Sequence, residues 1–190
     1  MESRALIFVL LIEFVLLGSA RAELQLVPRA TSYILDGVQF SQLAFPDGNK
    51  EVTYAPPAHW TYTGGSKQLT LRPPEKPQAE AIILKTVNTE AANFDENTMK
   101  KLVDQTVAAM PEGSTNVKVV SEQKNPLLID RKETFMVICN YALANQDYSR
   151  SILFLNRGNE QIRFQLTCRR SDFESLQKAF LTSQYSWQNL

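Results

Sequence analysis

The chain offers few side chains for acid–base, nucleophilic or metal chemistry. Its single histidine, His59, lies between Pro57 and Trp60, and its two cysteines are Cys139 and Cys168. Side-chain catalysis needs a tunable acid or base, or a nucleophile held beside one, and the sequence has no G-x-S-x-G turn for such a nucleophile. It also has no C-x-x-C or H-x-x-x-H spacing for a metal. We therefore predict no catalytic residue, no metal site and no cofactor, with a hydrolase of unfamiliar type using His59 as the alternative.

Two groups of residues suit binding better than catalysis. The first is an aromatic group beside the histidine, on a segment rich in proline and glycine, where rings offer apolar area together with a polar group. The second is the polar face of the last predicted strand. The structural alternatives are that Trp60 fills a sheet edge and that the polar face is simply solvated. The candidate binding residues are Tyr54, His59, Trp60 and Tyr62 in the first group, and Arg163, Gln165 and Arg169 in the second.

Alternating apolar residues predict the strands that must position these groups. We expect three short strands between residues 51 and 87, and further strands at 116–123, 133–144, 148–155 and 161–169. The strand at 133–144 is apolar on both faces and therefore belongs in the middle of a sheet. Gly64 and Gly65 predict a hairpin turn rather than a phosphate loop, because the G-x-x-x-x-G-K-[ST] spacing is missing.

Two helices are expected. The first is capped by Asn93 or Asp95, ends at Pro111, and has one apolar stripe at three-and-four spacing. The second starts at Ser171 or Asp172, and Trp187 follows it in a short tail that we expect on the domain edge. The stripe of the first helix consists of Met99, Leu102, Val103, Thr106, Val107 and Met110.

Polarity predicts the pairing of the last two strands. Setting Phe154 opposite Ile162 keeps apolar side chains together, whereas a slip of one residue would mix the faces. The strands of Cys139 and Cys168 then flank a middle strand, about 9.6 Å apart laterally and roughly 13 Å along the strands. Because a disulfide needs Cα atoms within about 7 Å, we predict two buried free thiols, although an exported cysteine pair also invites a disulfide.

Residues 1–22 have the pattern of a secretory signal peptide. Arg4 precedes an apolar run, and Ala20 and Ala22 have the small-residue spacing that a signal peptidase reads. The alternative, an uncleaved membrane anchor, is disfavoured by the shortness of the run and by the charge of Glu13 within it. We predict cleavage after Ala22 and a periplasmic or extracellular location, with residues 23–50 as an N-terminal arm and 51–190 as a single α/β domain without a membrane span.

The balance of charge limits the class of partner. The chain carries 20 basic and 20 acidic residues, for a formal net charge of zero. Because nucleic-acid binding needs a basic surface, we expect no nucleic-acid partner and instead a partner protein or small ligand.

The order of strand block, helix, strand, meander and terminal helix resembles the PsbP/Mog1-like fold family. Residues 52–60, Val-Thr-Tyr-Ala-Pro-Pro-Ala-His-Trp, are similar to an early "yP-x-x-W" segment of those proteins. Residues 127–130 running into 135–137, and the closing stretch from Phe173 to Trp187, are similar to their entry into the central strand and their last helix. The resemblance implies an α+β fold, a largely antiparallel sheet with helices on its faces in an α/β/α sandwich.

The same resemblance implies a function without catalysis. Members of the family mostly act as accessory or binding proteins, and the matching positions here are fold positions, so no functional residue carries over. We therefore predict an exported non-enzymatic accessory or binding protein. The alternatives are the His59 hydrolase and a purely structural envelope protein.

Overall fold

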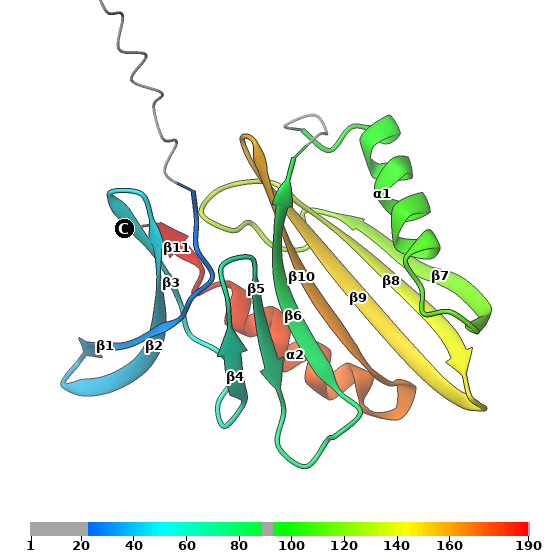
Figure 1. Ribbon diagram of the computed structural model, residues 1–190, viewed down its shortest axis with the longest axis horizontal. Helices are drawn as coiled ribbons and strands as arrows, with labels where there is room; N and C mark the ends of the chain where they lie inside the picture. The colour runs from blue at the N-terminus through cyan, green and yellow to red at the C-terminus, as the bar shows by residue number, and fades with distance from the viewer. Residues whose placement is uncertain (1–22, 89–92, 190) are drawn as a thin grey trace, which may run out of the picture.

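The computed structural model describes residues 23–88 and 93–189, so the predicted signal peptide at 1–22 lies outside the described residues. Two helices, α1 (Glu96–Ala108) and α2 (Phe173–Gln184), and a short 3₁₀ turn, η1 (Arg170–Asp172), accompany the strands (Figure 1). Neither helix is long and apolar enough to cross a membrane. The strands are β1 (Arg29–Leu35), β2 (Val38–Asp47), β3 (Lys50–Tyr54), β4 (Thr61–Gly64), β5 (Gln68–Arg72), β6 (Glu80–Val87), β7 (Thr115–Lys124), β8 (Thr134–Leu143), β9 (Gln146–Arg157), β10 (Glu160–Arg169) and β11 (Gln188–Asn189).

The strands form two antiparallel sheets. The large sheet has the order β4-β5-β6-β10-β9-β8-β7, and the small sheet has the order β1-β2-β3-β11. One core cluster joins Leu102 of α1 to the β8 and β9 residues of one face, whereas a second cluster joins Leu176 and Phe180 of α2, together with the small sheet, to the other face. The molecule is therefore the α+β sandwich that the sequence predicted.

Local signals in the sequence account for the elements that frame this sheet. The side chain of Asp95 caps α1 by accepting a hydrogen bond from the Thr98 amide at 2.7 Å, which satisfies one of the free N–H groups of the first turn. Strand β8 is paired on both sides, by β7 and β9, and most of its residues are buried. This confirms that a strand with two apolar faces lies inside the sheet, although β8 is next to the end strand β7 and β10 occupies the middle.

The N-terminal segment is more regular than the loosely organised arm that we expected at 23–50. Strands β1 and β2 form a hairpin around Asp36 and Gly37, which have φ angles of 50° and 77°. Two consecutive positive φ angles are the requirement of a type I′ turn, for which Asp-Gly is a preferred pair. Residues 29–47 are thus part of the small sheet, which continues directly into β3.

The pairing of β9 and β10 differs by one residue from the predicted register. Ile162 lies opposite Leu155, and Arg163 lies opposite Phe154. Polarity misled the prediction because Arg163 shares a face with Phe154, over whose ring its guanidinium lies at 5.5 Å from the centroid. A cation over an aromatic ring is a favourable contact, so a mixed face is stable here.

Both cysteines are buried free thiols, as predicted. Cys139 belongs to the core cluster on the α1 face of the sheet, whereas Cys168 belongs to the cluster on the α2 face. The two thiols are therefore kept apart because they lie on opposite faces of the sheet. The offset of about 13 Å along the strands, which the predicted register implied, is not the cause. Burial raises the pKa of both thiols, to about 12 for Cys168.

Trp187 is at the junction of the two sheets, not on the domain edge as expected. Its indole is 1% exposed and packs against Phe45 of β2 and Tyr54 of β3, both with ring centroids 5.9 Å away, and edge-on against Phe164 of β10 at 5.1 Å. The first two rings belong to the small sheet and the third to the large sheet. The prediction failed because a tail residue shows no periodicity that reveals the face it meets.

Neither thiol is expected to react in the folded protein. Because both are buried and favour the neutral form, iodoacetamide at about pH 8 should leave the native chain 23–190 unlabelled and add two labels after denaturation. Mass spectrometry reads the result, and a Ser66→Cys variant, with an exposed position, provides the reactive control. Labelling of the native chain, or a mass two hydrogens short with no label, would contradict this.

Trp187→Ala should be among the most destabilising substitutions in the chain. Removing a fully buried indole leaves a cavity between the sheets and is expected to lower the free energy of unfolding by about 3–5 kcal/mol, measured by urea denaturation. Val87→Ala, at a side chain 78% exposed, should change it by less than about 0.5 kcal/mol. A loss below about 1 kcal/mol for Trp187→Ala would show that the sheets are held together elsewhere.

Candidate functional site

A groove with a volume of about 520 Å³ opens between the β1–β2 hairpin and the loop that connects β3 to β4. Apart from His59, no residue that lines it carries a titratable acid or base other than a tyrosine hydroxyl. We call it the aromatic groove. Its lining consists of Ala30, Thr31, Tyr33, Phe40, Ser41, Gln42, Leu43, Ala55, Pro56, Pro57, Ala58, His59, Trp60 and Tyr62.

One wall of the aromatic groove is a pair of exposed rings on the hairpin. Tyr33 and Phe40 are directly opposite each other in the β1–β2 register, and their rings stack with centroids 5.3 Å apart. The side chains are 42% and 40% exposed. Cross-strand aromatic pairs of this kind stabilise a hairpin, so the rings hold their position without a covering layer.

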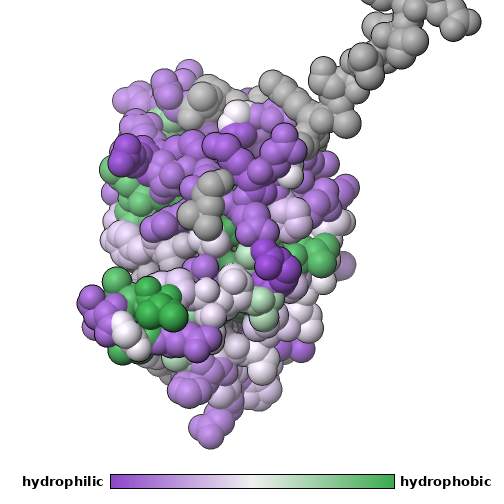
Figure 2. Space-filling view, turned by 90° about the vertical axis from the view of Figure 1, so that its left-hand side faces the viewer, coloured by the Kyte–Doolittle hydropathy of each residue, from purple (hydrophilic) through white to green (hydrophobic). Residues whose placement is uncertain are grey.

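The apolar surface continues beyond the rings to the end of the hairpin. Ile34, Leu35 and Val38, which we call the hairpin tip, are 74%, 56% and 55% exposed. Figure 2 shows hydrophobic side chains gathered on the part of the molecule that protrudes at the lower left, on the side where the hairpin lies. Leu35 and Val38 are paired on the face of the ring pair, whereas Ile34 alternates to the other face, so both faces of this end of the hairpin carry exposed apolar side chains.

The other wall is the loop after Pro56, which a tight turn and a ring contact hold in place. The Trp60 amide donates to the Pro57 carbonyl at 3.2 Å, and His59 has a φ of 66° at the third position of this turn. A positive φ at that position is typical of a type II turn. The indole of Trp60 stacks on Phe180 of α2, with centroids 6.1 Å apart and an interplanar angle of 8°, so Trp60 is half-buried and joins the groove to the core.

His59 lacks the neighbours that acid–base catalysis needs. Within residues 23–88 and 93–189 its imidazole has no hydrogen bond to a hydroxyl or carboxylate and no ion pair. The same residues contain no group of three or more His, Cys, Asp or Glu side chains that could hold a metal ion. What His59 supplies to the groove is an exposed imidazole ring.

Tyr54 must be removed from the candidate surface. It is fully buried in β3, where its hydroxyl and the Ser183 Oγ of α2 form a hydrogen bond of 2.8 Å. Burial raises the pKa of this phenol, which stays neutral. Tyr54 and Trp60 pack against the same core cluster, but only Trp60, which is half-buried, also lines the groove.

Arg163, Gln165 and Arg169 are not part of the aromatic groove. The Arg163 Nε donates to Gln161 at 2.9 Å while its guanidinium covers Phe154, and half-burial lowers its pKa. Arg163 and Gln165 line a separate depression of about 230 Å³ beside α1. The Nε of Arg169 donates to Gln78 at 3.3 Å. All three side chains are half-buried, and Arg163 and Arg169 have partners within the chain, so these two arginines are less free for a ligand than the sequence suggested.

The structure thus brings His59, Trp60 and Tyr62 together in one groove with Tyr33 and Phe40, two rings that the sequence analysis did not single out. A signal for them was present. An Asp-Gly pair flanked by apolar residues is a strong short-range indicator of a hairpin, and it fixes Tyr33 and Phe40 as cross-strand partners because each lies three residues from the nearer turn residue.

Comparison with known proteins supports the fold. No family model matches this chain, and neither does any curated protein. Among solved structures, the cyanobacterial PsbP protein CyanoP from Synechocystis sp. PCC 6803 is similar, with a TM-score of 0.50 and 12% identity over 90% of this chain and 95% of that one. The Saccharomyces cerevisiae Ran-binding protein Mog1p has a TM-score of 0.46 and 10% identity, covering 83% of this chain and 89% of its own.

A third structure, the protein of unknown function PA94 from Pseudomonas aeruginosa, has a TM-score of 0.47 and 13% identity and covers 83% of this chain and 94% of that one. At these identities the likeness concerns architecture alone. The chain has the PsbP/Mog1-like fold that its sequence resembled.

Proposed function

We propose that this chain is an exported, non-enzymatic binding protein that takes up an uncharged, extended segment of a partner protein in the aromatic groove. The observation that carries the proposal is the arrangement of exposed rings on both walls of the groove, Tyr33 and Phe40 facing the loop of His59, Trp60 and Tyr62. Aromatic side chains in a concave, partly desolvated surface are the residues that dominate the energy of protein interfaces. Because the lining carries no Asp, Glu, Lys or Arg, a charged segment would lose hydration without gaining a partner.

The free backbone of two outer strands supports an extended ligand. β1 and β4 are end strands of their sheets within the described residues, and residues of both line the groove. An end strand presents N–H and C=O groups that an extended peptide can pair with, while pockets select alternate side chains. The N-terminal segment already approaches one end of β4, where a Cβ on Gly64 would lie 2.4 Å from Pro28, which leaves the Thr61–Tyr62 end open.

A peptide selection tests the groove directly. Random peptides displayed on phage are selected on the chain 23–190 and counter-selected on Phe40→Ser. We expect enriched sequences with apolar residues at alternate positions and few charges. The dissociation constant of a synthetic selected peptide, measured by calorimetry, should rise at least about tenfold in Tyr33→Ser and in Tyr62→Ala, the loss of one well-placed aromatic contact.

Val120→Ser is the matched control, since Val120 is 45% exposed on β7, the end strand farthest from β4. It should leave the dissociation constant unchanged. Peptides that bind Phe40→Ser and the original chain equally well, or no enrichment at all, would refute the groove as the binding site.

The proposed export predicts a specific N-terminus for the mature protein. A signal peptide that is cut after Ala22 releases a chain beginning at Glu23, which N-terminal sequencing of the protein recovered outside the cytosol reads. Ala22→Arg should block the cut because signal peptidase requires a small residue there. A full-length protein that stays in the membrane fraction would favour the uncleaved anchor instead.

A further inference from the structure

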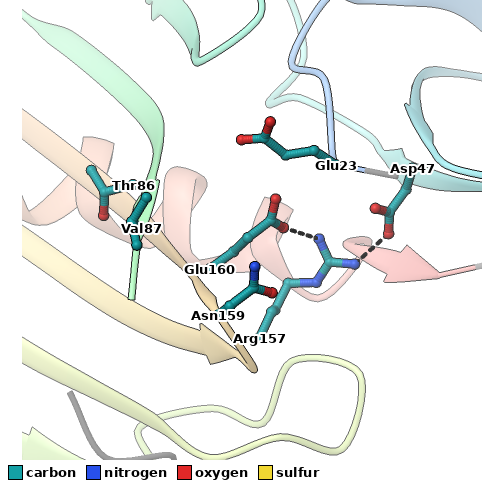
Figure 3. Close-up of a pocket in the computed structure, with 7 residues that line it drawn as sticks. All are labelled: Glu23, Asp47, Thr86, Val87, Arg157, Asn159 and Glu160. Atoms are coloured by element: carbon teal, nitrogen blue, oxygen red, sulfur yellow. Dashed lines mark hydrogen bonds and ion pairs between the residues drawn. The ribbon is translucent and has the colours of Figure 1, made fainter. Parts of the chain in front are cut away.

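Two hollows outside the aromatic groove have cations in their walls, and they differ in whether the chain supplies the opposite charge. Figure 3 shows the first, where the Arg157 guanidinium at the end of β9 contacts the carboxylates of Asp47 and Glu160. Lys85, which is almost fully buried, contacts Glu23 at 2.6 Å and Glu160 at 3.8 Å. Because these carboxylates and cations compensate one another, the first hollow needs no charged ligand.

The second hollow lies on the face of the large sheet that α1 covers in part. α1 packs on β7 and β8, whereas α2 packs on the other face, where it contacts β10 (Figure 1). Beside α1, the depression of about 230 Å³ that contains Arg163 and Gln165 opens over β5, β6, β9 and β10. We call it the arginine pocket.

Arg163 brings an unbalanced charge to the arginine pocket. Among the lining residues, all of which the structure describes, it alone is charged at neutral pH. Its Nη1 and Nη2 atoms have no hydrogen-bond acceptor and no carboxylate partner within residues 23–88 and 93–189, yet they are not buried, so a ligand can reach them. Half-burial lowers the pKa of this guanidinium, and no neighbouring acid offsets that loss of hydration.

Buried amides hold the guanidinium in position. Gln161 and Asn156 are almost fully buried, and the Gln161 Nε2 donates to the Asn156 Oδ1 at 3.0 Å while the Gln161 Oε1 accepts from the Arg163 Nε at 2.9 Å. The ring of Phe154 supports one face of the guanidinium. These contacts engage the Nε atom and one face of Arg163, and they leave the edge formed by Nη1 and Nη2 for a ligand. A guanidinium fixed in this way loses little freedom when it binds.

The rest of the lining is apolar or neutral. Ile82 and Leu84 of β6 face the arginine pocket, because Ile83 between them belongs to the core cluster on the α2 face. Gln165 of β10 and Gln105 of α1 add carboxamide groups, whose N–H atoms are hydrogen-bond donors. With one cation, two amides and no acid, this lining favours a ligand that combines a single negative charge with an apolar body.

We infer that the arginine pocket binds a small monocarboxylic acid, whose carboxylate accepts hydrogen bonds from the Nη1 and Nη2 of Arg163 and whose apolar body lies against Ile82 and Leu84. The planar fork of a guanidinium matches the two oxygens of a carboxylate. A phosphate dianion would add a second negative charge that no cation in the lining balances. The volume lies below the range of about 300–1,000 Å³ that is typical of drug-sized ligands, so the ligand is small.

An NMR titration tests this inference on the ¹⁵N-labelled chain 23–190 at about pH 7, where a carboxylic acid is ionised. The probes are hexanoate and phenylacetate. We expect at least one of them to cause saturable shifts of the amide signals of Arg163, Gln165 and Gln105, with a dissociation constant of about 1 mM, as suits a ligand with few non-hydrogen atoms. The corresponding neutral amide, hexanamide or phenylacetamide, should bind at least about tenfold more weakly because it lacks the charge.

Variants separate the arginine pocket from other surfaces. Arg163→Gln should raise the dissociation constant of the carboxylate at least about tenfold. Arg169→Gln is the matched control, since Arg169 is a half-buried arginine of the same strand that does not line the pocket, and it should leave the constant unchanged. Gln105→Trp, at an exposed position of α1, should obstruct the pocket and weaken binding while Arg163 remains.

Three results would overturn the inference. They are the absence of saturable shifts with either carboxylate, equal affinity for a carboxylate and its amide, and carboxylate binding that both Arg163→Gln and Gln105→Trp leave unchanged. The inference is independent of the peptide proposed for the aromatic groove, since the two linings share no residue. Tyr33→Ser, which should weaken the selected peptide, should therefore leave carboxylate binding as it is.

Discussion

The packing of Trp187 between the two sheets is the contact on which the rest of the structure depends. Its indole touches Phe45 and Tyr54 on the small sheet and Phe164 on the large one. Immediately after it, β11 pairs with β3 and completes the small sheet. Because Trp187 fills the junction and the next two residues add a strand to the small sheet, this short segment ties the two sheets together.

This junction explains why rings remain exposed on the hairpin. Along β2 the side chains change from exposed to buried at Leu43, where the strand begins to lie over the large sheet. The part of the hairpin before Leu43 projects past that sheet, so Tyr33 and Phe40 have no layer to pack against except each other. The loop of Trp60, held on α2 by Phe180, then lies opposite them. The aromatic groove is thus a consequence of how far the hairpin extends beyond the core.

The features that the sequence predicted correctly are those encoded within a short stretch of chain. The cap at Asp95, the interior strand β8 and the turn after Gly64 each follow from neighbouring residues. The features that it missed depend on distant partners. Buried Tyr54 finds its hydrogen-bond partner in Ser183, 129 positions away, and Trp187 is central because two sheets meet there. The register of β9 and β10 was predicted wrongly for a related reason. The prediction treated an arginine opposite Phe154 as unfavourable, whereas the guanidinium of Arg163 lies over that ring.

The two ends of β2 differ in what holds them, with the aromatic groove at the Phe40 end and ion-paired side chains at the Asp47 end. Seven residues separate Phe40 from Asp47, about 23 Å along an extended strand. At the Asp47 end the small sheet is held by ion pairs to Arg157 and by the segment from Leu24 to Leu26, which bonds both to Pro46 and to Ser66 of the β4–β5 turn. At the Phe40 end the paired rings remain 42% and 40% exposed. If the aromatic groove binds the proposed extended segment, its apolar surface is already formed, and preorganisation reduces the ordering entropy that binding costs. The proposal therefore assigns most of the affinity to the rings that line the groove.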